Sequence, residues 1–528
     1  MSTEHVVAHA GDLNDGEMKS VEIGDRTILL VRLDGRYRAF TPECPHHGAP
    51  LAEGVMHDHH IRCPWHQSVF DARDGSLVEP PSLDGLAEFD VRVEGDEVIV
   101  ALPDQTVASR PPVMAASTPG RDGRTFIIIG GGASGLMAAQ TLRHEGFLGR
   151  LVMLTREHVL PYDRTELSKR YLAGTDRPVP TLRDQGFFDD ADIEILFGEN
   201  VIEADLEARS ISCQDGLTMT YDRLLIATGG VPRRLGVEGE DLGNVFLLRT
   251  LDDCNRIRRA APQASTAVVV GASFIGMEVA AALRQRGLDV TVVAPDPVPF
   301  ARTLGEPIGA MYRRVHEDEG TRFRLGDTVE RFEGDGAVRQ VVLAGGDRLE
   351  ADLVVIGVGI RPATGFVEGV AVNDDQSLST DAHLRIVGAD GAFASGDIAR
   401  WPDWRTGRPL RIEHWRLALQ LGMTAGRTMM DLDAPYRGVP FFWTAQHRVI
   451  TSYVGYAAQW DDIAVDGDVE GRKFVAYYLD ADRRVLAAAG CGRGTLMTAL
   501  GDVLRTPELL TLEEVRAMAQ EVGHLQNV

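Results

Sequence analysis

Residues 1–104 alternate between apolar and polar side chains with a period of two. The runs RTILLVRLDGRYRAF and FDVRVEGDEVIVAL are examples, and each contains an Asp-Gly or Glu-Gly pair. Alternation of this kind is typical of strands with one buried face, and such glycine pairs are typical of hairpin turns. We therefore predict a small all-β domain in this part of the chain.

The pattern changes after this domain. Residues 105–124 are rich in Pro, Ser and Ala and have no lasting periodicity, which predicts a linker. The next stretch, TFIIIGGGASGLMAAQTLRHEG, has a later counterpart in TAVVVGASFIGMEVAAALRQRG. Each has an apolar run, a glycine turn and an Ala-rich helix, so the two copies predict two dinucleotide-binding α/β folds.

Strand patterns return near residue 435, in FFWTAQHRVITSYVG and KFVAYYLDADRRVLAAAGCG, and a helix pair is predicted from residue 495 to about 520. We read this last part as an α+β domain. The fold class predicted for the whole chain is multidomain: an all-β domain, two Rossmann-like α/β domains and an α+β C-terminal domain.

Composition narrows the functional classes. The chain has 528 residues, enough for roughly three to four domains. Its 54 Lys and Arg against 78 Asp and Glu give a net charge of −24, which opposes binding to nucleic acid or to anionic membranes. Five cysteines make no disulfide framework, and the N-terminus has no secretion signal and the chain no long apolar run. These features predict a cytoplasmic protein.

Two loops of the β domain carry candidate metal ligands. Cys44 and His46 form C-x-H, and Cys63 and His66 form C-x2-H. Each loop offers one thiolate and one imidazole, as a cluster needs when one iron is held by two Cys and the other by two His. A Cys2His2 zinc site would use the same four residue types, although zinc fingers usually pair like ligands within a loop.

On these two motifs, residues 5–104 resemble the Rieske [2Fe-2S] ferredoxin family. The resemblance implies that Cys44, His46, Cys63 and His66 are the cluster ligands and that His47 is only a neighbour. It also implies a potential low in the Rieske range, since the disulfide-forming cysteines of high-potential members are absent. Gln67 stands where related loops usually have glycine, so we expect it to alter cluster exposure or a partner-facing surface.

The first glycine turn has the spacing G-x-G-x-x-G, in Gly130, Gly132 and Gly135, with Ala133 and Ser134 inside it. It follows an apolar strand and opens a helix, where a pyrophosphate meets the helix N-terminus. The next strand leads to Glu157, an acid at the place where a ribose hydroxyl is expected. This arrangement predicts a dinucleotide site.

Three further segments, LPYDRTELSKRYL, YDRLLIATGG and GAFASGDIAR, resemble FAD-dependent reductases of the ferredoxin-reductase and apoptosis-inducing-factor type. The resemblance implies that Arg164 meets FAD and that Lys169 lies near the flavin ring. The remaining residues that it assigns to cofactor binding are Val201, Thr228, Gly229, Gly359, Asp397, Glu413, His414, Trp415 and Trp443. Cys213, Cys254 and Cys491 lack a close sequence partner, so disulfide chemistry is not expected.

The second glycine turn contains Gly271, Ser273 and Gly276 and predicts the nicotinamide dinucleotide site. Glu278 follows in what we read as the first helical turn, and the resemblance pairs it with Lys169 as the catalytic pair. The choice between NADH and NADPH stays open. Ala294 occupies the usual place of a ribose-binding acid, Asp296 comes two residues later, and Arg302 reaches a 2′-phosphate only if the loop folds back.

Nearly the whole chain resembles the Rieske-bearing, apoptosis-inducing-factor-like branch of these flavoproteins. The domains implied are 1–104 (Rieske), 105–124 (linker), 125–242 and 361–434 (FAD), 243–360 (NAD) and 435–528 (C-terminal), so the FAD and NAD domains are interleaved. We expect an NAD(P)H-dependent reductase that passes electrons through FAD to its own [2Fe-2S] cluster and on to an oxygenase or another acceptor. It would be a monomer or a homodimer.

Two other functions remain open at this point. One is a redox-switched signalling protein in which slow NADH oxidation changes dimerisation or partner binding. The other is direct conversion of a small organic substrate at the flavin, which would need a pocket that the sequence does not reveal.

Overall fold

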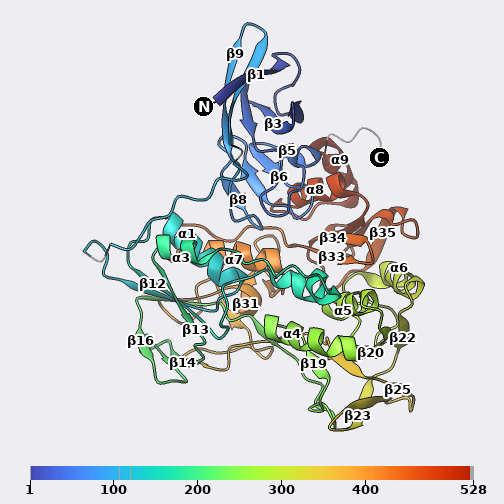
Figure 1. The fold of residues 1–528 in the computed structure, drawn as a ribbon. Coiled ribbons are helices and arrows are strands. Elements are labelled where there is room, and N and C mark those ends of the chain that lie inside the picture. Colours follow the sequence, from blue (N-terminus) through green and yellow to red (C-terminus); the bar gives the residue numbers. More distant parts are fainter. Residues whose placement is uncertain (1, 106, 119, 524–528) are drawn as a thin grey trace.

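The computed structural model describes residues 2–105, 107–118 and 120–523. In Figure 1 the N-terminal β domain stands on an α/β body, and the C-terminal helices α8 and α9 lie beside its lower end. The coarse prediction, a β region followed by α/β folds, is confirmed. No helix among the described residues is long and apolar enough to cross a membrane.

The N-terminal domain contains two antiparallel sheets. The two cluster loops lead into or connect strands of the second sheet. The first sheet has the order β1-β10-β9-β4-β3-β2 and the second β5-β6-β7-β8. Apolar side chains from both sheets, including Leu29 and Phe70, pack together with Cys44 and Cys63. The strands are β1 Ser2–His9, β2 Met18–Ile23, β3 Arg26–Leu33, β4 Arg36–Phe40, β5 Val55–His57, β6 His60–Arg62, β7 Val69–Asp71, β8 Leu77–Glu79, β9 Glu88–Glu94 and β10 Glu97–Pro103, and a 3-10 turn covers Leu51–Glu53.

The first α/β fold is built on a parallel sheet with the order β13-β12-β11-β17-β30. Its last strand comes from a segment far along the chain, and pairs Leu224 with Ala392. Helices α1 and α7 pack against each other beside this sheet. The elements are β11 Thr125–Ile129, α1 Ala133–His144, β12 Arg150–Thr155, α3 Gln185–Asp190, β13 Ile193–Phe197, β17 Arg223–Ile226, β30 Ala392–Ala394 and α7 Trp415–Thr428.

Two smaller sheets belong to the same part of the chain. One has four strands in the order β16-β15-β14-β28, and the other consists of β29, β31 and β32. Their bounds are β14 Val201–Asp205, β15 Ser210–Cys213, β16 Thr218–Thr220, β28 Val367–Glu368, β29 Leu378–Ser379, β31 Ala399–Pro402 and β32 Pro409–Leu410; η2 Arg164–Ser168, α2 Arg170–Ala173 and η4 Gly396–Ile398 are short helical segments.

The second α/β fold lies between the two halves of the first. Its parallel sheet has the order β19-β26-β20-β21-β22, and the ribbon of β18 and β27 stands where the chain enters and leaves it. The elements are β18 Gly230–Pro232, β19 Val245–Leu247, α4 Leu251–Ala260, η3 Ala261–Gln263, β20 Thr266–Val270, α5 Phe274–Gln285, β21 Asp289–Ala294, α6 Gly305–Asp318, β22 Arg322–Leu325, β23 Val329–Asp335, β24 Ala337–Leu343, β25 Arg348–Glu350, β26 Leu353–Ile356 and β27 Ile360–Pro362.

The C-terminal part has an antiparallel sheet of order β33-β34-β37-β36-β35 and the two helices predicted near residue 495. Val55 of the N-terminal domain belongs to its apolar core, together with Phe441 and Leu500. The N-terminal and C-terminal parts of the chain therefore share buried surface. The elements are β33 Phe441–Gln446, β34 Val449–Gly455, β35 Asp462–Asp468, β36 Lys473–Leu479, β37 Val485–Cys491, α8 Gly494–Val503 and α9 Leu512–Val522.

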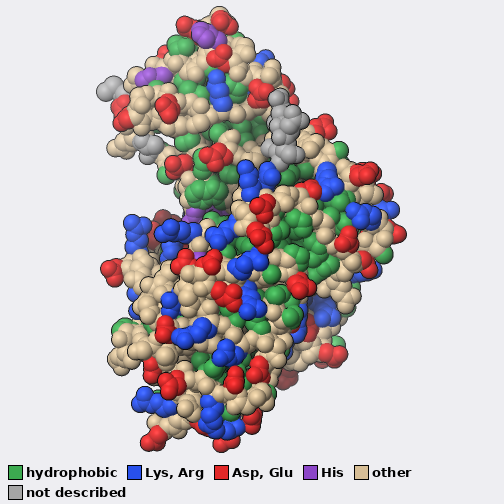
Figure 2. All heavy atoms as spheres, turned by 90° about the vertical axis from the view of Figure 1, so that its right-hand side faces the viewer, with side chains coloured by type: hydrophobic (Ala, Val, Ile, Leu, Met, Phe, Trp, Pro, Cys, Tyr) green, Lys and Arg blue, Asp and Glu red, His purple; other side chains and the backbone are tan. Residues whose placement is uncertain are grey.

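Figure 2 shows the outer face of this junction. The N-terminal domain is separated from the body by a hollow on one side and continues into it without a break on the other. All five cysteines of the described chain are free and buried, as expected for Cys213, Cys254 and Cys491.

Candidate redox site

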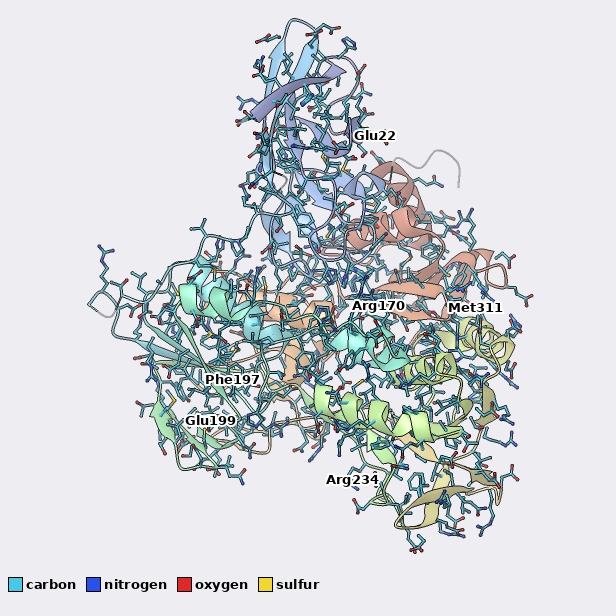
Figure 3. The ribbon with its side chains drawn as sticks, in the orientation of Figure 1. Glu22, Arg170, Phe197, Glu199, Arg234 and Met311 are labelled. Atoms are coloured by element: carbon cyan, nitrogen blue, oxygen red, sulfur yellow. The ribbon has the colours of Figure 1, made fainter. Side chains whose placement is uncertain are left out.

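A cavity of about 1180 Å³ lies where the two α/β folds and the C-terminal sheet meet. It extends from the first glycine turn at Gly130 to the second at Ser273, and Trp443 of β33 closes a third side. Figure 3 places Arg170, the neighbour of Lys169, beneath the N-terminal β domain. The cavity residue Trp443 contacts His66 of that domain.

Most of the residues predicted to bind cofactors line this cavity. They are Gly130, Gly132, Ala133, Ser134, Glu157, Arg164, Lys169, Val201, Thr228, Gly229, Ser273, Glu278, Gly359, Asp397, Glu413, His414, Trp415 and Trp443. Three glycines of the turns do not line it: Gly135, Gly271 and Gly276. Each packs closely against a backbone oxygen atom of its own turn or of the neighbouring loop.

The two glycine turns have the same geometry. Gly130 and Gly271 have φ of +122° and +111°, and a Cβ on either would lie 2.3 Å from a carbonyl oxygen of the neighbouring loop. A Cβ on Gly135 or Gly276 would lie about 2 Å from the oxygen of the turn's first glycine. These glycines let strand, turn and helix approach closely enough for a pyrophosphate to reach the helix N-terminus.

Lys169 and Glu278 form an ion pair at the centre of the cavity. Lys169 Nζ lies 2.9 Å from Glu278 Oε2, and Ser168 Oγ donates to the same oxygen. Glu278 is the fifth residue of α5 and lies in its second turn, so our expectation of a first-turn position was wrong. The helix dipole acts mainly within the first turn, so Lys169 and the hydroxyl donors stabilise this carboxylate instead.

A chain of buried hydrogen bonds continues from Glu278 into the C-terminal domain. Thr444 Oγ1 donates to Glu278 Oε1, and Gln446 Nε2 donates to Thr444 Oγ1, each over 2.8 Å. Gln446 Oε1 in turn lies 2.8 Å from Nε2 of His316, whose pKa is lowered to about 4 by burial. Neutral His316 must therefore carry its proton on Nε2, and every donor in the chain points toward the carboxylate.

Other charged residues in the cavity are held by local partners. Glu157 is paired with Arg164 and accepts a hydrogen bond from Tyr162 Oη over 2.7 Å. Asp397 is paired with Arg249 at 2.7 Å. Arg249 lines the cavity, and Thr444 bonds to Glu278 from outside it. The sequence did not reveal either residue, because no motif contains them.

The start of α7 contributes a second group of cavity residues. Arg411 Nη1 donates to Glu413 over 2.6 Å, and burial raises the pKa of Glu413. Burial also lowers the pKa of His414 to about 4, and its ring stacks on that of Phe442. His414 is therefore neutral near pH 7 and presents a flat, uncharged surface at the cavity wall.

The four predicted cluster ligands converge in two pairs. Nδ1 of His46 and Nδ1 of His66 lie 3.1 Å apart. The thiols of Cys44 and Cys63 are both buried and hydrogen-bonded to each other, which lowers the pKa of Cys63 with help from backbone N–H groups of the loop. Two sulfurs on one side and two nitrogens on the other fit a [2Fe-2S] cluster with one iron on each pair.

His47 packs against both predicted histidine ligands, with its ring centroid 4.0 Å from that of His46 and 5.5 Å from that of His66. Its Nε2 lies 3.8 Å from Asp163 Oδ2, at the start of η2 in the FAD-binding part of the chain. The two loops themselves close alike, since the N–H groups of Gly48 and Gln67 each bond to the carbonyl of the loop cysteine.

The cluster site and the cavity share one indole ring. The ring centroid of Trp443 lies 4.1 Å from that of His66 and 6.4 Å from that of His46, and Trp443 also lines the cavity. Lys169 is close enough to His66 to contribute to lowering its pKa, after burial and His47. The imidazole side of the cluster therefore faces the cavity.

Comparison with known proteins agrees with this geometry. Residues 124–422 match the family described as pyridine nucleotide-disulphide oxidoreductase, and residues 3–90 match the Rieske [2Fe-2S] domain. The chain belongs to the pyridine nucleotide-disulphide oxidoreductase family and carries a Rieske domain.

Relatives within the family place the chain more closely. Apoptosis-inducing factor 3 of Mus musculus is 36% identical over 521 residues, which cover 97% of this chain and 86% of that protein. The ferredoxin–NAD(+) reductase component of the biphenyl dioxygenase system of Paraburkholderia xenovorans is 34% identical over 348 residues, covering 66% and 84%. The reductase in the covalent putidaredoxin reductase–putidaredoxin complex superposes with a TM-score of 0.70 at 29% identity, covering 76% of this chain and 100% of that one.

These findings confirm the predicted class of protein. The chain is an oxidoreductase of the apoptosis-inducing-factor-like, ferredoxin-reductase type, and its cofactors are FAD, a [2Fe-2S] cluster and NAD(P)H. The Rieske match also decides between an iron-sulfur and a zinc site in favour of the former.

Proposed function

We propose that the protein is an NAD(P)H-dependent reductase that delivers electrons to its own Rieske cluster and from there to an oxygenase or another one-electron acceptor. NAD(P)H would lose a hydride, which carries two electrons and one proton. Two molecules of acceptor would take one electron each, and the proton would be released. When bound, FAD supplies the conversion from hydride to single electrons, and the cluster carries those electrons one at a time.

The contact between Trp443 and His66 is the observation that carries the proposal. A ring from the cavity wall touches a predicted cluster ligand, so the two redox sites are separated by little more than one side chain. The complex of putidaredoxin reductase with putidaredoxin joins, by its name, a reductase to a second protein. Here the ferredoxin-like part belongs to the same chain.

Each group of cavity residues would have a separate role in binding the cofactors or in hydride transfer. The two glycine turns bind the pyrophosphates of FAD and NAD(P)H, and Glu157 binds a ribose. Asp397, held by Arg249, and Arg164, held by Glu157, contact FAD. Lys169 and Glu278 are the proposed catalytic pair, which orients the nicotinamide and places a fixed positive charge beside the flavin.

A cluster-free variant tests this function. In Cys63→Ser, rapid mixing with NADH under anaerobic conditions should still bleach the flavin at the wild-type rate, while reduction of cytochrome c should be lost. Cys491→Ser, which changes a buried thiol outside the cluster loops, is the matched control. If Cys63→Ser reduces cytochrome c as fast as wild type, electrons do not leave through the cluster.

Turnover rates together with a size measurement with and without NADH separate the alternative function. Slow turnover in the wild type together with a change of mass on adding NADH would favour a redox-switched binding protein. We propose the reductase because Trp443 of the cavity wall contacts the predicted cluster ligand His66, which a signalling role does not require.

A further inference from the structure

Gln67 adopts a left-handed backbone conformation, which residues other than glycine rarely adopt. Its φ is +58°, and the equivalent residue of the other cluster loop is Gly48 with φ of +75°. Both N–H groups bond to the carbonyl oxygen of the preceding loop cysteine. A glycine at 67 would make this turn without strain, whereas glutamine needs contacts that offset the strain.

The side chain of Gln67 leaves the cluster loop and enters the C-terminal domain. It is 2% exposed, and its Nε2 donates to the carbonyl oxygen of Met497 in α8 over 2.9 Å. Gly501 lies one helical turn further on, and a Cβ there would be 2.1 Å from Gln67 Oε1. The amide group therefore lies flat on α8 in a space that exists only because residue 501 is glycine.

The backbone carbonyl group of Gln67 also has a partner in the FAD-binding fold. Its carbonyl oxygen accepts a hydrogen bond from Arg416 Nη2 on α7 over 2.9 Å. Arg416 is fully buried, and burial lowers its pKa to about 10. One residue of the cluster loop is thus bonded both to the FAD-binding fold and to the C-terminal domain.

Buried charges surround this contact. Glu79 of the N-terminal domain accepts from Arg416 at 2.8 Å and from Arg505 of the C-terminal domain at 2.5 Å. Arg62 is paired with Asp502 at 2.7 Å across the same junction. These ion pairs cross the same junction as the Gln67 contacts, so undocking the N-terminal domain would break all of them together.

We propose that Gln67 and Gly501 form a lock that keeps the Rieske domain docked with its histidine ligands against Trp443 throughout turnover. Gln67 is a positioning residue: it acts on electron transfer through the place of the loop that carries His66. The partner-facing surface expected around Gln67 is then a surface of the same chain. This inference rests on the proposed transfer from the flavin site to the cluster, but the docking itself can be measured separately.

The lock differs from a direct effect of Gln67 on the cluster. The N–H group of residue 67 bonds to the carbonyl oxygen of Cys63, and any residue other than proline keeps that bond. Replacing the side chain should therefore leave the cluster assembled and its potential unchanged while loosening the dock. A shift in potential without a change in docking would point to tuning instead.

A double-mutant cycle on the complete holoenzyme tests the lock. The variants are Gly501→Ala, Gln67→Gly and both together, with Gly494→Ala on the same helix as control, because a Cβ at 494 meets no atom within 4 Å. Docking is read from hydrogen exchange of peptides covering residues 63–71 and 494–503, and transfer from the rates of flavin and cluster reduction by NADH.

The expected results are specific. Gly501→Ala should raise exchange in both peptides and slow cluster reduction at least about tenfold, with flavin reduction within about twofold of wild type. In the Gln67→Gly background, Gly501→Ala should have no further effect, because the side-chain oxygen Gln67 Oε1 that the alanine Cβ displaces is absent. Gly494→Ala should behave as wild type.

Two results would overturn the lock. One is unchanged exchange in Gly501→Ala; the other is an equal effect of the alanine with and without the Gln67 side chain. If exchange follows the cycle but the wild-type cluster is never reduced from the flavin, the lock stands and the proposed function fails.

Discussion

The ring of Trp443 lies against that of His66, with centroids 4.1 Å apart and planes inclined by 45°. The first residue comes from β33 of the C-terminal domain and the second from a loop of the N-terminal domain. The contact therefore requires both ends of the chain to fold onto the same face of the α/β body. It joins a cavity wall to a predicted cluster ligand through a single side chain.

Replacing Trp443 should slow the step between the two redox sites. Trp443→Leu removes the ring that fills the space beside His66, and we expect cluster reduction to slow about tenfold, equivalent to about 1.4 kcal/mol on the barrier. Flavin reduction by NADH should change little. Stopped-flow absorbance at flavin and cluster wavelengths measures both.

Trp460→Leu is the control for this change. Trp460 packs on Tyr478 in the same domain and does not line the cavity. Equal slowing of cluster reduction in the two variants would mean that loss of packing in the C-terminal domain, and not the contact with His66, sets the rate.

Glu278→Gln should reduce both stability and hydride transfer. Lys169, whose side chain is 17% exposed, would lose its carboxylate partner. Removing one member of a buried pair costs about 3 kcal/mol or more. Thermal unfolding and single-turnover flavin reduction report the two effects.

An exposed ion pair provides the comparison. Arg313 and Glu317 lie on the surface of α6, 2.8 Å apart, and Glu317→Gln should cost less than about 1 kcal/mol. If the two variants unfold alike, the Lys169 pair contributes no more than a surface pair.

The sequence predicted the residues that lie within local motifs. The cluster loops and the two glycine turns are defined by spacing over a few residues, so they could be identified without a fold. Arg249, which holds Asp397, belongs to no motif, and Thr444 reaches Glu278 from 166 residues away. Contacts of this kind depend on how domains pack, which no local pattern encodes.

Gln67 marks the same limit. The sequence singled it out as an unusual residue in a glycine position, and its positive φ agrees with that reading. Its partners Met497 and Gly501 lie in another domain, more than 400 residues along the chain. The sequence alone could identify the exception but not the surface that explains it.

Acid should destabilise the protein through His316. Its pKa in the folded state is about 4, below the usual 6.5, because the ring is buried. Between these values the unfolded chain binds a proton that the folded chain does not. The stability is therefore complete above about pH 6.5 and falls as the pH decreases toward 4, by up to about 1.4 kcal/mol per pH unit.

His316→Gln tests this dependence while keeping an N–H donor for Gln446. Urea unfolding at pH 7, 6 and 5 should give a shallower loss of stability in the variant than in wild type. His414, whose pKa is also about 4, would account for part of the loss that remains. Identical pH profiles for variant and wild type would show that His316 does not contribute.

The loop after β21 should influence the choice between NADH and NADPH. Strand β21 ends at Ala294, where an acid would bind the ribose of NADH. Two residues on, Asp296 is paired with Arg302 at 3.0 Å, so the loop folds back as a 2′-phosphate site would require. The arginine side chain is 80% exposed, but its charge is engaged by Asp296.

Removing that carboxylate should free the arginine for a phosphate. In Asp296→Ala, the ratio of kcat/KM for NADPH to that for NADH should rise about tenfold, because a charge-assisted contact replaces a repulsion. Arg302→Ala should lower the same ratio below that of wild type, since it removes the only cation of the pair. Steady-state kinetics with both coenzymes measure the ratio, and unchanged ratios in both variants would place the 2′-position of the coenzyme away from this loop.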